Sequence, residues 1–319
     1  MKLGLINLSN KIKTNNTIAS METLSIKSAL EALGHEVVIN SNNCDKLIVV
    51  NGAANFYGGV RNDYIINNYK MMAEFDGEIL YFLVDLGLPF KQLWPNIQKR
   101  AWNDLTEDEV HVENIKIISQ SWNTELVKKI HKCDYDVEYF PIDRWGIYFN
   151  DLYEKRFANE KKYDLAYCGG HRGKRRVKKI QEFYINSDLD VMLCGNLKES
   201  HFENVGENIT FKKKVKTKDL LYENSLGKAT VIIGDNNYNG NMVTLRVWES
   251  LLSNMVVFVD SEFDPEHRLF DDIYYIDSPN QIKERLNQVQ GQQQLIKGIG
   301  DINNPKGKDE WLAQLDKFI

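Results

Sequence analysis

The sequence predicts an α/β protein made of two doubly wound domains that face one cleft. Short apolar runs recur along the chain and are separated by segments with helical periodicity. This is the pattern of parallel sheets that helices cover on both faces. A polar, charged connection interrupts it near residues 143–162, after which the alternation begins again. We therefore expect a first domain over residues 1–150, a second over 151–303, and a C-terminal helix over 304–319 that can pack back on the first.

In the first domain, bare apolar runs predict strands at residues 3–8, 36–39, 46–52, 78–85, 115–120 and 137–142. A helix is predicted at 21–33, where Ile26, Leu30 and Leu33 recur at helical spacing after the N-cap residue Ser20. Further helices are expected up to about residue 75 and at 124–132.

In the second domain, apolar runs predict strands at residues 163–168, 189–195, 229–234, 255–260 and 273–276. Helices are expected from the basic residues after 170 to about 184, near 219–225, after Thr244, from 279, and at 308–318. The segment between the second of these strands and the short helix is interpreted as a lysine-rich loop.

Composition limits the class of protein. The chain has 319 residues, of which 43% are hydrophobic, with a net charge of −5. No segment approaches the roughly 18 apolar residues of a membrane span, and the first residues lack a signal peptide, so we expect a cytoplasmic protein. The four cysteines are widely spaced, which favours free thiols over disulfides or a zinc site. The acidic balance does not itself favour nucleic-acid binding, although two local basic clusters do.

The first basic cluster follows a glycine pair. Gly169 and Gly170 end an apolar run, and His171, Arg172 and Arg176 follow among further lysines and arginines. Glycines let backbone N–H groups approach an anion closely, and the N-terminus of the following helix favours negative charge. The pattern predicts a phosphate-binding loop.

A second polar stretch supplies the rest of a nucleotide site. A β-rich run ends at Gly234 and leads through a polar loop into a helix that carries Arg246 and Glu249. Three residues apart, these side chains share one helical face. The arginine can bind a pyrophosphate and the glutamate a ribose diol.

Three features of the first domain lie where ligands of open α/β sheets bind, at or near the carboxyl ends of predicted strands. Asp85 is placed to act as a general base, although a turn or N-cap aspartate is equally consistent. Glu22, near the first strand, either contacts a ligand or complements a helix dipole. An aromatic, glycine-rich loop either binds a ligand or covers the core edge; its residues are Asn55, Phe56, Tyr57, Gly58 and Gly59.

Residues 45–59, 81–102 and 232–268 together carry a specific resemblance. In order and spacing they are similar to segments of the DNA β-glucosyltransferase family of T-even bacteriophages, and the match runs from the first strand to about residue 275. The resemblance implies the GT-B fold. It also implies inverting transfer of a sugar, normally glucose, from a UDP-sugar to the hydroxymethyl group of 5-hydroxymethylcytosine in duplex DNA, with the target base flipped out.

The resemblance assigns roles by position. Asp85 corresponds to the general base, Glu22 to a carboxylate on the donor sugar, and Tyr57 to the loop aromatic that enters the DNA. The donor-binding positions are Arg172, Arg176 and Arg246 for the phosphates, Tyr238 for the pyrophosphate, Glu249 for the ribose and Val215 for the uracil. The family has Gly-Gly-Ser-Phe where this chain has only His171 between Gly170 and the arginine, so how the β-phosphate is held stays open.

The implied partners are a UDP-sugar and double-stranded DNA with a hydroxymethylated pyrimidine. The protein itself is expected to be a monomer in the cytoplasm of an infected bacterium. A divalent cation, Mg²⁺ or Mn²⁺, can assist UDP departure, but no carboxylate pair identifies protein ligands. Three alternatives stay open. The donor can be another UDP-sugar, for example the pentose arabinose; the acceptor can be a small molecule or glycan; or the chain can be an inactive nucleotide- or DNA-binding protein.

Overall fold

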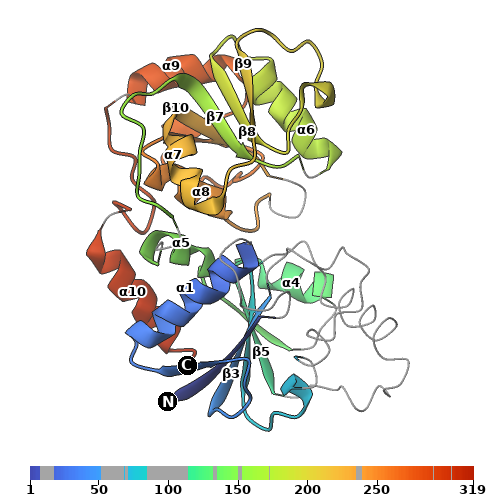
Figure 1. Cartoon of the computed structure of the whole chain (residues 1–319), viewed down its shortest axis with the longest axis vertical. Helices are drawn as coiled ribbons and strands as arrows, with labels where there is room; N and C mark the ends of the chain where they lie inside the picture. Colours follow the sequence, from blue (N-terminus) through green and yellow to red (C-terminus); the bar gives the residue numbers. More distant parts are fainter. Residues whose placement is uncertain are drawn as a thin grey trace. The chain divides into compact units, whose positions relative to one another are not determined.

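The computed structural model describes residues 1–7, 18–51, 68, 71–84, 114–131, 135–149, 153–171, 173–234, 239–289, 291–302 and 304–319. The chain forms two compact units (Figure 1). Unit 1 comprises Met1–Asn150 together with Lys308–Ile319, and unit 2 comprises Asp151–Gly307.

Unit 1 contains a six-stranded parallel sheet in the order β2-β1-β3-β4-β5-β6. Its strands are β1 (Lys2–Asn7), β2 (Glu36–Ile39), β3 (Lys46–Asn51), β4 (Ile79–Leu83), β5 (Ile115–Ser119) and β6 (Asp136–Tyr139). Every side chain of β4 is buried. Burial on both faces explains why this strand is apolar throughout and does not alternate.

The helices of unit 1 include α1 (Ile18–Ala32), α4 (Thr124–His131), the 3-10 turn η2 (Ile142–Arg144) and α5 (Trp145–Tyr148). Helix α1 buries Ile26, Ala29 and Leu30. Its polar residue Thr23 accepts a hydrogen bond from the Asn7 side chain, with a donor–acceptor distance of 2.6 Å. Apolar and polar contacts therefore both hold α1 beside the end of β1.

Unit 2 contains a second six-stranded parallel sheet, in the order β12-β11-β10-β7-β8-β9. Its strands are β7 (Tyr163–Gly169), β8 (Val191–Gly195), β9 (Ile209–Lys213), β10 (Gly227–Ile232), β11 (Val256–Asp260) and β12 (Tyr275–Ile276). Counted from β7, this is the 3-2-1-4-5-6 order of dinucleotide-binding domains. The two parallel-sheet units confirm the predicted fold class.

The helices of unit 2 are α6 (Lys174–Ile180), α7 (Leu220–Ser225), α8 (Leu245–Leu252) and α9 (Asn280–Val289), with the short turns η3 (Gln181–Ile185), η4 (Glu199–His201), η5 (Thr217–Asp219) and η6 (Asp272–Tyr274). Figure 1 shows α7 and α8 side by side, in agreement with their contacts. None of the described helices combines the length and apolar character needed to cross a bilayer.

The structure corrects two expectations about secondary structure. Residues Ile209–Lys213, expected to lie in a lysine-rich loop, form the edge strand β9. The polar connection expected at 143–162 contains η2 and α5, and Trp145 of α5 is buried. Its charged residues therefore surround a short apolar element that belongs to the core of unit 1.

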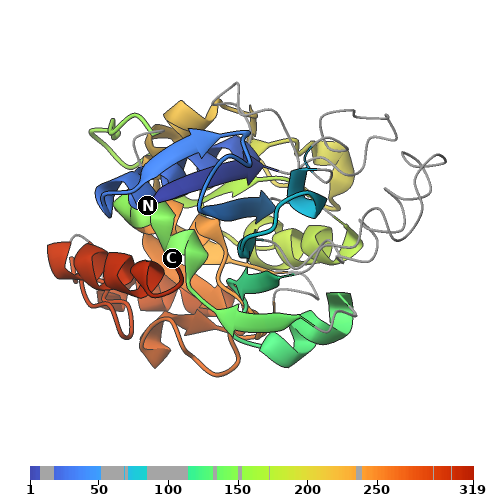
Figure 2. The ribbon, with the colours of Figure 1, turned by 90° about the horizontal axis from the view of Figure 1, so that it is seen from below.

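The C-terminal helix α10 (Pro305–Asp316) returns to unit 1. Trp311 is 1% exposed, its indole N–H donates to the Pro141 carbonyl oxygen at 2.9 Å, and its ring packs 5.2 Å from that of Phe140. Figure 2 shows α10 in red beside the green segment around α5. The end of the chain thus completes the core that its beginning forms.

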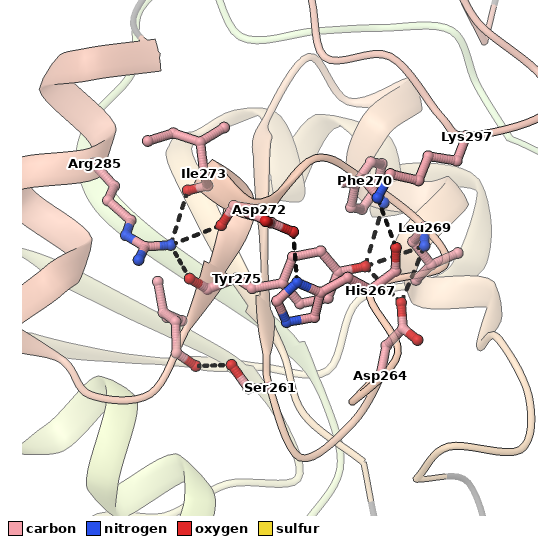
Figure 3. A network of polar contacts seen from close by, with 11 residues as sticks. Ser261, Asp264, His267, Leu269, Phe270, Asp272, Ile273, Tyr275, Arg285 and Lys297 are labelled. Carbon is pink, nitrogen blue, oxygen red and sulfur yellow. Dashed lines mark hydrogen bonds and ion pairs between the residues drawn. The ribbon is translucent and has the colours of Figure 1, made fainter.

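A polar network closes the connection from β11 to β12 (Figure 3). The Tyr275 hydroxyl donates to the buried Asp264 carboxylate at 2.5 Å and accepts from the Leu269 backbone N–H at 3.1 Å. The His267 ring stacks on Tyr275 with centroids 3.7 Å apart, and Arg285 of α9 donates to three backbone carbonyls of residues 272–275. This network fixes an irregular segment that adjoins Gly240, whose N–H donates to the Phe263 carbonyl oxygen.

Candidate nucleotide-binding site

The strand order of unit 2 reverses between β7 and β10, which lie side by side in the sheet. In open α/β sheets, ligands bind beyond the carboxyl ends of the strands at such a switch point. Here β7 ends at Gly169, and β10 leads through Gly234 toward α8. The two stretches that the sequence singled out therefore meet at the edge where this topology favours a ligand.

Close packing at this edge requires glycine. A Cβ at Gly169 would lie 2.7 Å from Arg246 Nη2 and 3.1 Å from the Tyr167 ring. A Cβ at Gly195, which ends β8, would lie 1.9 Å from the Gly169 carbonyl oxygen. Any larger residue at either position would displace the backbone or the arginine.

Arg246 lies in the first turn of α8, directly beside Gly169. Its guanidinium carbon is 4.7 Å from the Tyr167 ring centroid, and its Nε donates to the Cys168 carbonyl oxygen at 3.4 Å. Burial acts to lower the pKa of Arg246, but Tyr167 and Glu249 act in the opposite direction, and the net pKa is raised. The site therefore holds a permanent, half-buried positive charge that suits a phosphate.

Glu249 lies one turn further along α8. Its Oε1 accepts a hydrogen bond from the Tyr153 hydroxyl at 2.6 Å. Burial raises the pKa of Glu249, while Tyr153 and Arg246 oppose that shift. A carboxylate held this way can accept hydrogen bonds from a vicinal diol.

Helix α6 carries the basic residues that follow Gly170. Arg176 is buried, with 7% of its surface exposed. Two other cations are engaged by carboxylates, because Lys179 Nζ lies 3.0 Å from Asp260 Oδ2 and Arg175 Nη2 lies 2.7 Å from Glu262 Oε2. Part of the positive charge of α6 therefore attaches the helix to the last residue of β11 and to the segment that follows it.

His171 follows the glycine pair and lies beside a second histidine. Its Nδ1 is 2.8 Å from the Asn196 carbonyl oxygen, and its ring centroid is 4.2 Å from that of His201.

Val215 lies after β9, partly buried against an apolar cluster of Ala166, Met192, Cys194, Leu226 and Met255. Cys168 and Cys194 are register partners on β7 and β8, and both are free thiols, as is Cys44. The hydrogen bond that the Cys168 thiol donates to Cys194 raises the pKa of Cys168, and burial raises it further. The buried side chains against which Val215 packs are thus apolar, which suits contact with a nucleobase.

The remaining predicted positions lie in α1 or outside the described residues. Glu22 belongs to α1, which follows β1. Asp85, Arg172 and Tyr238 lie outside the described residues, as does the loop of Asn55, Phe56, Tyr57, Gly58 and Gly59. The order of the sheet in unit 1 reverses between β1 and β3, so Glu22 and this loop follow the two strands at that switch point. Their roles stay predictions.

Sequence reasoning missed two tyrosines of the site. Tyr153 lies in the segment interpreted as a polar connection, where nothing in the local pattern points to Glu249. Tyr167 precedes the glycine pair by two residues, so the alternation of a strand places it on the same face as Gly169. The alternation of side chains along β7 therefore could have indicated that the Tyr167 ring lies on the side of the strand where Arg246 packs.

No group of three or more histidine, cysteine, aspartate or glutamate side chains gathers as a metal site within the part of the chain that the structure describes.

The chain is similar to known proteins both in sequence and in structure. Residues 1–146 match the family model described as bacteriophage T4 beta-glucosyltransferase. The DNA beta-glucosyltransferase of Enterobacteria phage T4 is 35% identical over 350 residues, covering 100% of this chain and 99% of the relative.

Solved structures of that phage enzyme also match over their whole length. T4 phage BGT in complex with UDP and Mn²⁺ is 32% identical, with a TM-score of 0.82 and 99% of each chain covered. T4 phage BGT in complex with its UDP-glucose substrate is 31% identical, with a TM-score of 0.81 and the same coverage. The resemblance found in the sequence is confirmed, and the chain belongs to the bacteriophage T4 β-glucosyltransferase family of enzymes.

Proposed function

We propose that this protein transfers glucose from UDP-glucose to the hydroxymethyl group of 5-hydroxymethylcytosine in duplex DNA, with inversion at the anomeric carbon. It would act as a monomer in the cytoplasm of a phage-infected bacterium. The proposal rests on membership of a family whose relatives are named DNA beta-glucosyltransferase and bind UDP-glucose. The observation in this chain that supports it best is the pairing of Gly169 with Arg246, one turn from Glu249, at the switch point of unit 2.

Unit 2 would bind the donor. Arg246 and Arg176, with Arg172, would bind the two phosphates, assisted by Tyr238. Glu249, oriented by Tyr153, would accept hydrogen bonds from the ribose hydroxyls. Val215 would contact the uracil. Positive groups fixed beside the diphosphate stabilise the charge that develops on UDP as it leaves, without reorganising at that moment.

Unit 1 would bind the acceptor. The hydroxymethyl oxygen is a weak nucleophile until a base takes its proton, and Asp85 is assigned that role. Glu22 would contact the donor sugar. The target base cannot be reached within the stack, so it would swing out at a cost of a few kcal/mol, and Tyr57 with its loop would enter the space it leaves.

A single displacement by the acceptor oxygen accounts for inversion. The bond from the anomeric carbon to the β-phosphate oxygen breaks as the new glycosidic bond forms, and the proton passes to Asp85. One relative was solved with Mn²⁺ as well as UDP.

The decisive experiment offers the protein a hydroxymethylated duplex with a panel of UDP-hexoses and UDP-pentoses, and measures the mass added to the DNA. We expect one hexose per modified cytosine with UDP-glucose and none on an unmodified duplex. If a pentose is transferred, the donor is a UDP-pentose and not UDP-glucose. If sugar is transferred only to an acceptor other than DNA, the proposed function is wrong.

A further inference from the structure

Lysines gather where strand β9 ends. Residues 209–219 include five lysines and one aspartate, although the whole chain has a net charge of −5. Lys212 is partly buried, and its Nζ lies 2.7 Å from Glu223 Oε2. The other four lysines are exposed, and the function proposed above gives them no role. These four, Lys213, Lys214, Lys216 and Lys218, are called the lysine segment.

The side chains of the lysine segment are not neutralised by neighbouring carboxylates. None of the four forms an ion pair with a residue that the structure describes. Asp219, the next residue in sequence, pairs instead with Arg156, with Nη2 3.4 Å from Oδ1. On α6, by contrast, Lys179 and Arg175 are both engaged by carboxylates. The positive charge of the lysine segment is therefore available to an anionic partner.

The main chain of the same segment is held in place. The Lys213 carbonyl oxygen accepts a hydrogen bond from the Cys194 thiol at 3.3 Å. The Lys218 carbonyl oxygen accepts one from the Glu154 backbone N–H at 2.9 Å. Between them, Val215 packs against the apolar cluster of unit 2. A fixed main chain with exposed lysine side chains binds an anion at a lower cost in ordering than a free loop does.

Strand register places the lysine segment beside the candidate nucleotide site. Lys213 of β9 pairs with Gly195 of β8, and Gly195 pairs with Gly169 of β7 (Figure 1). Neighbouring strands lie about 4.8 Å apart, so the Cα atoms of Lys213 and Gly169 are roughly 10 Å apart. Arg246 packs against Gly169. Because the three strands are parallel, the lysine segment follows the same edge of the sheet as the nucleotide site.

The arrangement suits a polyanion better than a single diphosphate. The proposed function already assigns three arginines to the two phosphates of the donor. Duplex DNA carries one negative charge per about 1.7 Å of its axis, and lysines bind such phosphates without reading sequence. A target base that is flipped toward the donor brings its flanking phosphates near this edge. A local positive surface also offsets the repulsion between DNA and a chain of negative net charge.

We propose that the lysine segment is a surface of unit 2 that binds the phosphate backbone of the duplex DNA acceptor. This inference rests on the proposed function, because it takes duplex DNA as the acceptor. It adds unit 2 to a DNA-binding surface that the proposed function places on unit 1. Contacts of this kind raise the affinity for any duplex and leave the choice of base to other residues.

The test is a triple variant of the full chain, Lys213→Gln with Lys214→Gln and Lys216→Gln. Fluorescence anisotropy measures its affinity for hydroxymethylated and unmodified duplexes between about 50 and 200 mM salt. We expect affinity at the lower salt to fall at least about tenfold, equally for both duplexes. The slope of log affinity against log salt concentration should decrease by about one per lysine. UDP affinity, measured by calorimetry, should change by less than about twofold, which also shows that unit 2 is folded.

The matched control removes the same charge from the opposite edge of the sheet. Lys161 and Lys162 directly precede β7, and Lys228 is the second residue of β10. All three are exposed. The triple variant with glutamine at these positions should change DNA affinity by less than about twofold. In sugar transfer, the variant of the lysine segment should raise the KM for DNA and keep kcat, whereas the control should change neither.

Three results would overturn this inference. Equal loss of DNA affinity in the two triple variants would show that only the total charge of the protein matters. Unchanged DNA affinity and salt dependence in the variant of the lysine segment would mean that these residues do not contact DNA. Loss of UDP affinity without loss of DNA affinity would assign the lysines to the donor. A parent protein that transfers no sugar to a hydroxymethylated duplex overturns the proposed function, and this inference with it.

Discussion

Glu249 shows how a binding residue can reduce the stability of the protein that carries it. Burial raises its pKa, so the folded protein holds this proton more tightly than the unfolded chain does. The contribution of the group to stability is therefore present below the ordinary pKa of a glutamate and is lost as pH rises through the raised value. At neutral pH the ionised, partly buried carboxylate costs stability, which the Tyr153 hydroxyl only partly offsets.

We predict that Glu249→Gln makes unit 2 more stable at neutral pH while it weakens UDP binding. The glutamine cannot titrate, so the gain in unfolding free energy should grow from about pH 4 toward neutrality and then level off. Urea unfolding across this range, with calorimetry of UDP binding, measures both effects. The exposed Glu284→Gln on α9 serves as the control and should change neither quantity. A gain that shrinks as pH rises would contradict the sign of the shift.

At Asp85 the prediction separates chemistry from donor binding. Asp85→Asn should abolish sugar transfer, because the amide cannot take the proton of the acceptor hydroxyl. UDP affinity should change by less than about tenfold, since the residue acts on the acceptor and not on the nucleotide. Single-turnover transfer and calorimetry on the same sample decide this. If Asp85→Asn lowered sugar transfer and UDP affinity together, the assignment of Asp85 as the general base would be wrong.

How much of the site the sequence revealed depended on distance along the chain. Arg246 and Glu249 were paired correctly on one helical face because helical spacing is a local property. Nucleotide chemistry predicts that the glycine pair and Arg246 serve one site, but the contact of Gly169 with Arg246, and the Tyr167 ring beside the guanidinium, depend on tertiary structure. The bond from Tyr153 to Glu249 joins residues 96 positions apart, and no local pattern predicts it.

At the scale of elements, a buried ion pair attaches helix α6 to strand β11. Lys179 and Asp260 are both largely buried, with Nζ 3.0 Å from Oδ2. Burial acts to lower the pKa of Lys179, but the hydrogen bond with Asp260 outweighs it and the pKa is raised. Burial raises the pKa of Asp260, which shows that this carboxylate relies on its partner. The pair joins the helix after the glycine loop to the end of β11.

Lys179→Met should therefore destabilise unit 2 by about 3–5 kcal/mol, because it leaves Asp260 buried without its cation. The exposed pair of Lys283 and Asp188 provides the control, and Lys283→Met should change stability by less than about 0.5 kcal/mol. Denaturant unfolding of both variants measures the difference. A small effect for both would mean that the helix is held by packing alone.

The elements that the sequence predicted best are those buried on both faces. Strands such as β4 and β11 are continuous apolar runs, and the structure confirms them to within a few residues. Strand β9 was missed because its sequence, Ile-Thr-Phe-Lys-Lys, has two lysines and only one fully buried residue. It is an edge strand, where lysines discourage pairing with other chains, and so it resembles a loop in composition.

For the whole molecule, the arrangement that matters is the return of α10 to the first unit. Residues 308–319 belong to unit 1 although the whole of unit 2 separates them from the rest of it in sequence. Trp311 contacts the rings of Phe140, Tyr148 and Phe149 and bonds to Pro141. Unit 1 therefore reaches its full stability only when the chain has passed through unit 2 and come back.

Trp311→Ala should consequently weaken unit 1 and spare unit 2. Removal of a buried tryptophan costs about 3–5 kcal/mol, and here it also leaves the Pro141 carbonyl without its donor. In hydrogen exchange, peptides of β1 and β3–β6 should lose protection while those of β7, β8, β10 and β11 keep it, and UDP affinity should be unchanged. Phe157→Ala, at an exposed aromatic of unit 2, should alter neither unit. Because α10 is joined to both units, equal loss of protection in the two sheets would instead mean that they unfold as one cooperative body.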